Sequence, residues 1–208
     1  MRLLDGDGTL FAGLAEEMQA CAKAGLEFEV VPGVSVATAV PAFAGVPPTS
    51  SSVGTVHVVD AASGFDPTAM NDAQSSVVLI GQPRDLSASV QLLLHAGRDG
   101  DTPAVVTTEG PTIRQRSINA PLERLVDVID ALPGETDYPV VVFVGPTAAM
   151  RDRVSWFETK PLFAWRVLVP RTQAQSGPIT DRLARYGAKV DLVPTISVEP
   201  PRTPHQMD

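Results

Sequence analysis

Short apolar runs alternate with helix-like patterns along most of this chain, and that alternation limits the folds open to it. Arg2–Leu4 resembles the end of a strand, residues 10–24 place apolar side chains on one helical face, and Phe28–Val31 is a second strand-like run. Ser35 then occupies an N-cap position before the alanine-rich stretch Val36–Ala44, which we interpret as a helix. Strands that alternate with helices build parallel sheets, so the sequence predicts an α/β fold.

The same alternation continues to the end of the chain and divides it into three parts. The polar run Thr49–Ser52 marks a boundary, so we assign residues 1–50 to a first domain, 51–158 to a second and 159–208 to a third. In the second domain we predict strands at 53–59, 76–80, 104–107, 116–121 and 139–144, and helices at 86–96 and 122–131. In the third part we predict a strand at 166–169, a helix at 175–186 and a strand at 189–193. Two strands and one helix cannot bury a core alone.

The pair Trp156-Phe157 lies just before the third part. Large aromatic side chains at such a place commonly pack a linker against its domain, and contact with a ligand is the alternative. We expect the clamping role.

Charge and cysteine content exclude several classes of function. The net charge of -8 opposes binding to nucleic acid, which needs a basic face to displace counterions from phosphates. Cys21 is the single cysteine, so neither an intrachain disulfide nor a multi-cysteine metal site can form. No apolar run approaches the roughly 20 residues that span a bilayer, and the first residues lack the layout of a signal peptide. We therefore expect a cytoplasmic protein with neither nucleic acid nor a membrane as partner.

Two glycine-containing loops precede the first two predicted helices, where α/β proteins bind ligands at the carboxyl ends of strands. In residues 5–9, Gly6 and Gly8 let backbone amides approach a ligand closely, and the carboxylates of Asp5 and Asp7 suit an ammonium group or a ribose hydroxyl. A plain turn is the alternative, and the pattern alone favours it. In residues 31–35, Ser35 stands at a helix start, where free amides favour a polar or anionic group. Ordinary N-capping explains this serine about as well.

Two further loops follow strands of the second domain. Leu79-Ile80-Gly81 is a strand that ends in glycine, and its carbonyl groups suit an adenine amine. Residues 109–112, followed by Arg114 and Arg116, form a glycine loop with cations nearby. Simple turns explain both loops equally well, and neither is a dinucleotide fingerprint or a phosphate-cradling loop. The histidines are too scattered to predict a metal site.

Taken in order, these loops resemble the motifs of the uroporphyrinogen-III C-methyltransferase (tetrapyrrole methylase) family. Its members carry Gly-Gly-Asp-Pro before a helix, then Val-Val-Pro-Gly-x-(Ser/Thr), then an alanine-rich helix that ends in Ala-Gly-x-Pro-x-Thr. The counterparts here are Asp5-Gly6-Asp7-Gly8, Val30-Val31-Pro32-Gly33-Val34-Ser35 and Ala42-Phe43-Ala44-Gly45-Val46-Pro47-Pro48-Thr49. Residues 102–104, 109–112, 114–116 and 156–157 also match in order. The resemblance covers residues 2 to about 158. Each motif alone is weak, whereas their joint order is specific.

The resemblance implies S-adenosylmethionine-dependent C-methylation of the tetrapyrrole uroporphyrinogen III, on the route to sirohaem and cobalamin, by a homodimer. In the family the cofactor lies between two α/β domains. By motif position, the residues implied to bind it are Asp5, Gly6, Asp7, Leu10, Ser35 and Val36 from the first domain and Ile80 and Gly110 from the second. Glycine loops offer backbone hydrogen bonds, and Leu10 and Ile80 offer apolar walls.

The tail resembles a second family. Residues 166–172, a helix that contains Leu183, the segment Tyr186–Ala188 and residues 193–201 are similar to the opening of uroporphyrinogen-III synthase. Methyltransferase and synthase domains are fused in this order in some bacteria, notably actinobacteria. The resemblance implies that residues 159–208 are the first strand-helix-strand of a synthase-like domain, and that the chain is an excerpt from such a fusion, truncated at both ends.

Several family positions differ here. The family's first glycine-rich cofactor loop and its acid/base residues would lie upstream of Met1, so we predict no catalytic residue within the chain. Asp5 replaces a glycine, Gly8 a proline and Ile80 a methionine, and Thr49–Ser51 stands where the family has Thr-His-Arg. We therefore expect no turnover by this chain alone. The alternative is a non-catalytic methylase domain that serves a fused synthase as scaffold or dimerisation module.

Overall fold

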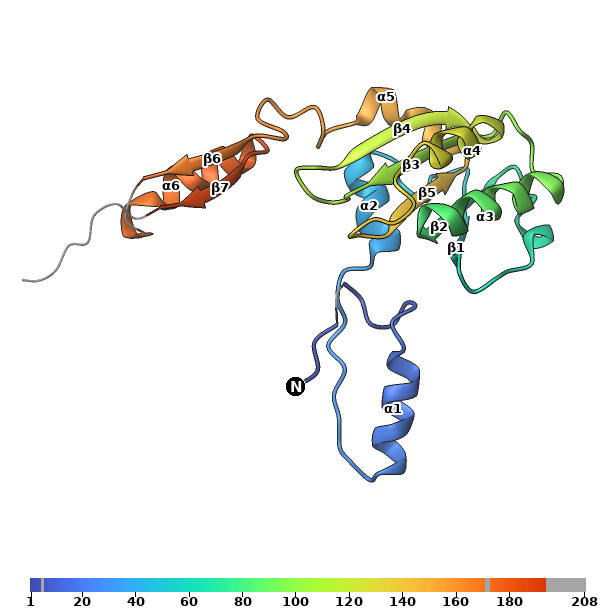
Figure 1. The fold of residues 1–208 in the computed structure, drawn as a ribbon, viewed down its shortest axis with the longest axis horizontal. Coiled ribbons are helices and arrows are strands. Elements are labelled where there is room, and N and C mark those ends of the chain that lie inside the picture. Colours follow the sequence, from blue (N-terminus) through green and yellow to red (C-terminus); the bar gives the residue numbers. More distant parts are fainter. Residues whose placement is uncertain (5, 171–172, 194–208) are drawn as a thin grey trace, which may run out of the picture. The chain divides into compact units, whose positions relative to one another are not determined.

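The computed structural model describes residues 1–4, 6–170 and 173–193, and the chain divides into two compact units (Figure 1). The first unit is Met1–Trp156 and the second is Phe157–Asp208. Asp5 and the motif residues from 194 onward lie outside the described residues. The predicted division at residue 50 falls within the first unit and stays a prediction.

A mixed sheet of five strands is the centre of the first unit. In space the strands follow the order β1-β2-β5-β3-β4; β1 and β2 are parallel, and the other neighbours are antiparallel. Their bounds are Thr55–Asp60 (β1), Ser75–Gly81 (β2), Pro103–Thr108 (β3), Arg116–Pro121 (β4) and Val140–Val144 (β5). All the strands predicted for the second domain are therefore confirmed, with small shifts at their ends.

Strand β5 lies in the middle of the sheet because its sequence is apolar throughout. Every residue of Val140–Val144 is buried. A strand covered on both faces cannot alternate apolar with polar side chains, so it shows as an uninterrupted apolar run. The edge strand β4 has a mixed pattern, in which Ile118 and Asn119 are exposed.

The two faces of the sheet bury separate apolar clusters. Successive residues of β2 point to opposite faces, so Val77 joins one cluster and Val78 the other. Helices α3 (Pro83–His95) and α4 (Leu122–Asp130) cover the first face. Helix α2 (Val36–Ala44) covers the second face (Figure 1). A helix predicted in the first domain thus packs on the sheet of the second.

The strands predicted at Arg2–Leu4 and Phe28–Val31 are wrong. Among residues 1–4 and 6–35 the structure contains the helix α1 (Leu14–Lys23) and no strand. A strand requires a neighbour for its backbone N–H and C=O groups, and apolar composition alone does not supply one. Without such a neighbour in the described residues, Val31 remains 82% exposed. The predicted parallel sheet does not form in this segment.

Helix α1 also begins later than its apolar pattern predicts. Phe11 and Gly13 have positive φ angles of 61° and 71°, which a right-handed helix does not accommodate. The helix therefore starts at Leu14, so Leu10 lies in the preceding turn. Gly25, with φ of 67°, follows the C-cap as predicted. No residue of α1 is buried.

Trp156 clamps the end of the first unit onto α2, which confirms its predicted role. Its indole N–H donates to the carbonyl oxygen of Ala42 at 2.9 Å, and its ring centroid lies 5.1 Å from that of Phe43. Between β5 and Trp156 the chain forms a 3-10 helix (Pro146–Met150) and the short helix α5 (Arg151–Val154). A second 3-10 helix (Pro67–Met70) precedes β2.

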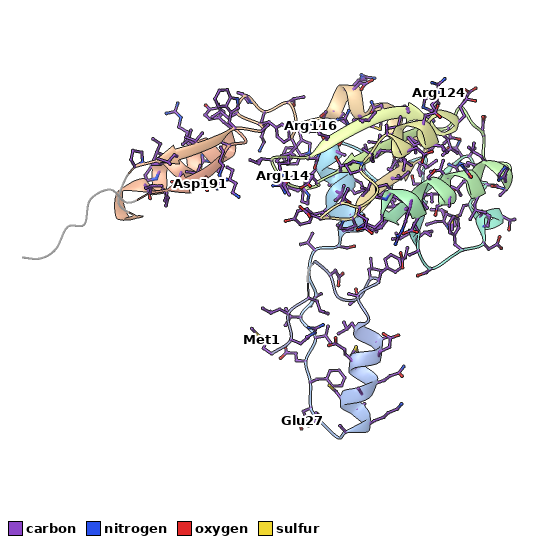
Figure 2. The ribbon with its side chains drawn as sticks, in the orientation of Figure 1. Met1, Glu27, Arg114, Arg116, Arg124 and Asp191 are labelled. Carbon is purple, nitrogen blue, oxygen red and sulfur yellow. The ribbon has the colours of Figure 1, made fainter. Side chains whose placement is uncertain are left out.

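The second unit contains the predicted strand-helix-strand. Strand β6 (Arg166–Val169) and strand β7 (Lys189–Leu192) are parallel, and α6 (Gln173–Arg185) connects them. The guanidinium of Arg166 forms an ion pair with Asp191, a carboxylate labelled in Figure 2. This pair joins the two strands on their exposed side.

Candidate functional site

The two glycine loops that precede α1 and α2 lie against each other. A Cβ added at Gly33 would lie 1.8 Å from the carbonyl oxygen of Gly6 and 3.2 Å from Cα of Asp7. Gly6 has a φ of +70°, and its own added Cβ would lie 3.4 Å from the carbonyl oxygen of Val34. Only glycine at position 33 allows this approach, because any Cβ there would overlap the neighbouring backbone. We call residues 6–9 and 31–35 the glycine-loop pair.

Asp7 stabilises the first of these loops. Its Oδ1 accepts hydrogen bonds from the backbone N–H of Thr9 at 3.0 Å and from the Thr9 hydroxyl at 2.8 Å. The hydrogen bond from the Thr9 N–H lowers the pKa of Asp7 most, and the bond from the Thr9 hydroxyl lowers it next. The Gly33 N–H also lowers this pKa. At neutral pH the loop therefore presents a carboxylate next to two glycines. This hydrogen bonding is also that of an ordinary turn, which was the alternative interpretation.

Replacing Thr9 with alanine is expected to raise the pKa of Asp7 toward its ordinary value of 3.8, because the hydroxyl donor is lost. The pKa in the folded loop is lowered, so these bonds stabilise the fold above the ordinary pKa, and that stabilisation is lost as the pH falls through the folded pKa. An NMR titration of the carboxyl carbon measures the shift.

Thr68→Ala is the matched control, because Thr68 donates to Asp66 through the same pair of groups. The control variant should raise the pKa of Asp66 and leave that of Asp7 unchanged. An Asp7 titration identical in the wild type and Thr9→Ala would contradict the assignment.

A cavity of about 590 Å³ lies beside the glycine-loop pair. Residues 1–4, 6–9 and 27–31 line it together with one side of α1. Two of these residues, Met1 and Glu27, are labelled in Figure 2. Sites for small molecules commonly enclose roughly 300–1,000 Å³, so this volume suits a metabolite. Leu10 does not line the cavity; its N–H donates to the carbonyl of Asp7 at 3.2 Å.

Ser35 and Val36 begin helix α2. The Ser35 hydroxyl accepts a hydrogen bond from the N–H of Ala37 at 3.1 Å, which is the N-capping geometry predicted for it. Val36 packs at the margin of the apolar cluster between α2 and the sheet. These contacts show structural roles for both residues, and their predicted contact with a cofactor stays a prediction.

Ile80 lies at the carboxyl end of β2, where its side chain is 9% exposed within the cluster under α2. Its carbonyl oxygen already accepts a hydrogen bond from the N–H of Ala61 at 2.9 Å. A carbonyl oxygen has two lone pairs, so this bond leaves one for an adenine amine, and the suggested contact stays a prediction. Because the Ile80 side chain is almost fully buried, only a narrow edge of it is available to a ligand.

Gly110 lies on the same face of the sheet, against α2. A Cβ added there would lie 2.9 Å from Cγ1 of Val40, so glycine allows the loop to approach the helix closely. In the same loop, Arg114 forms an ion pair with Glu109 at 2.8 Å, and the carboxylate raises the pKa of Arg114 (Figure 2). Much of the charge of Arg114 is thus paired within its own loop.

The structure gathers the described candidate residues into two groups. The members are Gly6, Asp7 and Leu10 in the first group, and Val36, Ile80 and Gly110 in the second. Gly33 joins the first group through its contact with Gly6, and α2 joins the second. Ser35 is the last residue of the loop that contains Gly33 and the N-cap of α2. It therefore connects the first group to the second along the chain.

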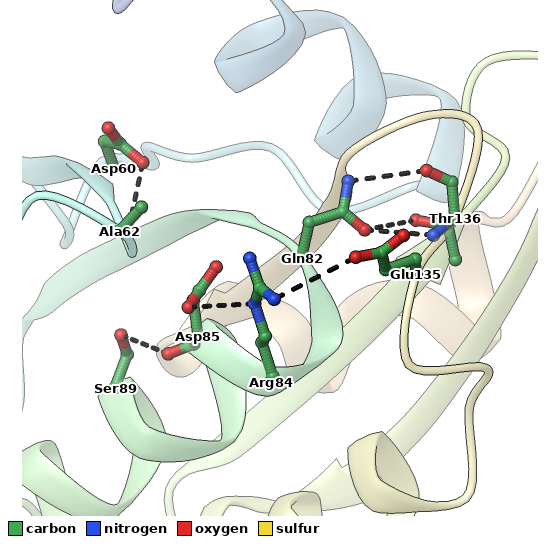
Figure 3. A network of polar contacts seen from close by, with 8 residues as sticks. All are labelled: Asp60, Ala62, Gln82, Arg84, Asp85, Ser89, Glu135 and Thr136. Atoms are coloured by element: carbon green, nitrogen blue, oxygen red, sulfur yellow. Dashed lines mark hydrogen bonds and ion pairs between the residues drawn. The ribbon is translucent and has the colours of Figure 1, made fainter.

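Two polar residues that the sequence analysis did not select lie at the carboxyl ends of β1 and β2. Asp60 accepts hydrogen bonds from the N–H of Ala62 at 3.1 Å and from the Ser63 hydroxyl at 2.6 Å, and Figure 3 shows the first of these. Gln82 extends from the end of β2 to Thr136. The strand-end signal that selected Ile80 also applies to both, because ligands of α/β sheets bind at this edge.

Among residues 1–4, 6–170 and 173–193, no group of three or more histidine, cysteine, aspartate or glutamate side chains is arranged to hold a metal ion. Over the same described ranges, no helix is both long and apolar enough to cross a bilayer.

The sequence is similar to proteins of a known family. Residues 1–126 match the family described as Tetrapyrrole (Corrin/Porphyrin) Methylases. The porphyrin biosynthesis protein HemD of Ruminiclostridium josui is 30% identical over 207 residues, covering 96% of this chain and 41% of that protein. The uroporphyrinogen-III C-methyltransferase of Bacillus subtilis (strain 168) is 28% identical over 202 residues, covering 93% of this chain and 41% of that protein. The chain thus spans about two fifths of the length of these relatives.

A solved structure shows the same fold. The uroporphyrin-III C-methyltransferase of Thermus thermophilus, complexed with S-adenyl homocysteine, aligns with a TM-score of 0.56 and 24% identity. The alignment covers 70% of this chain and 64% of that one. The family match covers more than half of the residues, so this chain belongs to the tetrapyrrole (corrin/porphyrin) methylase family.

Proposed function

We propose that this chain forms part of the cofactor site of an S-adenosylmethionine-dependent methyltransferase that acts on uroporphyrinogen III. Membership of the family and the similarity to the Bacillus subtilis enzyme support the reaction. The S-adenyl homocysteine complex of the Thermus thermophilus enzyme supports the cofactor. The observation that carries the proposal is the contact of Gly6 with Gly33. The two glycines let the loops approach closely, and both residues are exposed, so their backbone groups are accessible to a ligand.

The glycine-loop pair offers two kinds of group to such a cofactor. Its backbone amides donate hydrogen bonds, and the Asp7 carboxylate accepts them from an ammonium group or a ribose hydroxyl. Leu10 supplies apolar surface next to the loop, and Gly110 with the edge of Ile80 supplies it on the face covered by α2. When bound, the cofactor would supply an electrophilic methyl group on a sulfonium: a carbon of the tetrapyrrole would form the new bond to the methyl, the sulfur would keep the electrons of the broken bond as a thioether, and the tetrapyrrole would release a proton. The residues named here bind and orient it.

Calorimetric titration of the chain with S-adenosylmethionine and S-adenosylhomocysteine tests the proposal. We expect saturable binding of both ligands. Adenosine triphosphate is the control ligand; it shares the nucleoside, but its phosphates meet the Asp7 carboxylate and a chain of net charge -8. A folded chain that gives no heat at millimolar S-adenosylhomocysteine would contradict cofactor binding and would favour the non-catalytic scaffold.

For the second unit we propose the start of a uroporphyrinogen-III synthase-like domain. The alignment with the Ruminiclostridium josui protein takes in 96% of the chain and so includes residues of this unit. Its two strands leave Trp165 and Leu168 more than half exposed, which suits coverage by further elements. A hybrid protein tests the proposal, in which residues 157–208 replace the aligned segment of that relative. A folded hybrid with uroporphyrinogen-III synthase activity supports it, and a hybrid that does not fold contradicts it.

A further inference from the structure

The side chain of Gln82 pairs with the backbone of Thr136 (Figure 3). Its Oε1 accepts a hydrogen bond from the Thr136 N–H at 3.0 Å, and its Nε2 donates to the Thr136 carbonyl oxygen at 3.4 Å. The Thr136 hydroxyl lies 3.2 Å from the same Oε1 but 2.6 Å from the carbonyl oxygen of Tyr138. Its single proton favours the shorter contact, so the pairing is chiefly one of side-chain amide with backbone amide.

This pairing lies just beyond the last backbone pair of the β2–β5 ladder. Gly81 is opposite Val140 in the antiparallel register, and beyond that point the two backbones separate. Gln82 leaves the strand to begin α3, while residues 133–139 form the loop that leads into β5. A carboxamide has the same donor and acceptor as a peptide group. The side chain of Gln82 therefore pairs with the backbone of Thr136 as a second peptide group would.

Gln82 is held by its backbone as well. Its carbonyl oxygen accepts hydrogen bonds from the N–H groups of Asp85 at 3.0 Å and Leu86 at 3.1 Å, at the start of α3. Two residues earlier, the Ile80 carbonyl is bound by Ala61. Hydrogen bonds thus join the turn between β2 and α3 to the first turn of α3 and to the loop that follows β1. The Gln82 side chain joins it to the loop before β5.

Within the described residues, the ion pair that joins a neighbour of Gln82 to that loop is weaker. Arg84 and Glu135 approach to 3.9 Å, but their side chains are 70% and 82% exposed, and such pairs contribute little. Within residues 133–139, Thr136 is half-buried, whereas residues 133–135 and 137–139 are exposed. Thr136 is therefore the point at which this loop is anchored.

We propose that Gln82 is a positioning residue for the cofactor, because its bond to Thr136 sets the turn Ile80–Gly81 at the edge where the ligand would bind. The inference rests on the proposed function. It extends that function to a side chain that need not touch the ligand. Small displacements of such a wall weaken binding strongly, since contacts at the site depend on distances of tenths of an ångström.

Gln82→Met tests the role, because methionine keeps the length of the side chain and removes both hydrogen bonds. We expect its dissociation constant for S-adenosylhomocysteine to rise about 10-fold, in line with the loss of about one well-formed hydrogen bond. Gln82→Glu keeps an acceptor for the Thr136 N–H and should recover much of the affinity. Calorimetry gives the affinities, and hydrogen exchange of the Thr136 amide reports the tether directly.

Ser89→Ala is the matched control in the same helix. It removes the hydrogen bond from the Ser89 hydroxyl to the Asp85 carbonyl, 2.8 Å long, and leaves the turn at Gly81 intact. We expect a similar drop in melting temperature and an unchanged affinity. If Gln82→Met binds as tightly as the wild type, the positioning role is overturned and the proposed function stands. If the folded wild type itself does not bind S-adenosylhomocysteine, both fail.

Discussion

Replacing Arg98 with methionine is expected to lower the free energy of unfolding by about 2–4 kcal/mol. The side chain is 3% exposed, and its partners are three carbonyl oxygens and the Ser75 hydroxyl. Nη1 donates to the carbonyls of Met70 and Asp72, each at 2.6 Å, and Nη2 donates to the carbonyl of Ser75 at 2.8 Å. Burial lowers the pKa of Arg98 and Asp72 raises it, but a guanidinium stays protonated. Methionine would fill the space but remove the guanidinium donors of the Met70 and Ser75 carbonyls, which costs about 1–3 kcal/mol each before relaxation. The Asp72 carbonyl keeps the N–H and the hydroxyl of Ser75 as donors.

Urea unfolding followed by circular dichroism measures this loss. Arg124→Met is the matched control, because Arg124 is 68% exposed in its ion pair with Asp127 and should change the stability by no more than about 0.5 kcal/mol (Figure 2). Arg98→Lys should fall between the two, since one ammonium cannot reach all of the carbonyls. A loss below about 1 kcal/mol in Arg98→Met would show that these carbonyls find other donors.

Replacing Gly33 with alanine is expected to weaken binding of S-adenosylhomocysteine by about 100-fold or more. The new Cβ would lie 1.8 Å from the carbonyl oxygen and 2.7 Å from the carbonyl carbon of Gly6, so one of the two loops must move. These are backbone atoms, which cannot swing aside as a flexible side chain does. The apolar clusters of the sheet do not include Gly33, so the urea midpoint of the first unit should hardly change.

Gly54→Ala is the matched control for this substitution. A Cβ added at Gly54 meets nothing within 4 Å, so the same chemical change should leave affinity intact. Calorimetry compares both variants with the wild type. Wild-type affinity in Gly33→Ala would show that the contact between the loops is not needed for binding.

The loops and caps of the candidate site could be predicted from local sequence, but the contacts between them could not. The loops around Gly6 and Gly33, the cap at Ser35 and the glycine at 110 each have a local signal of turn or helix start. Nothing local indicates that the carbonyl of Gly6 lies against Gly33, or that Gly110 lies against Val40. Such contacts depend on how distant segments pack.

The same distinction explains the errors in the fold. The strand-like runs at Arg2–Leu4 and Phe28–Val31 have the composition of strands, but pairing needs a neighbour that composition does not describe. Phe11 and Gly13 adopt positive φ angles within a run that has the apolar spacing of a helix. Arg98 follows a helix-ending glycine like many exposed arginines, and only packing buries it.

By itself, the sequence determined the elements whose period and caps are local: the sheet strands, the helices on both faces and the strand-helix-strand of the tail. It also determined which loops have the residue types of a cofactor site. The tertiary structure alone decided the order of the strands, the packing of α2 on the second sheet face and the tether from Gln82 to Thr136. The physical reason is that periodicity acts over a few neighbouring residues, whereas burial and hydrogen bonding between distant segments depend on the whole fold.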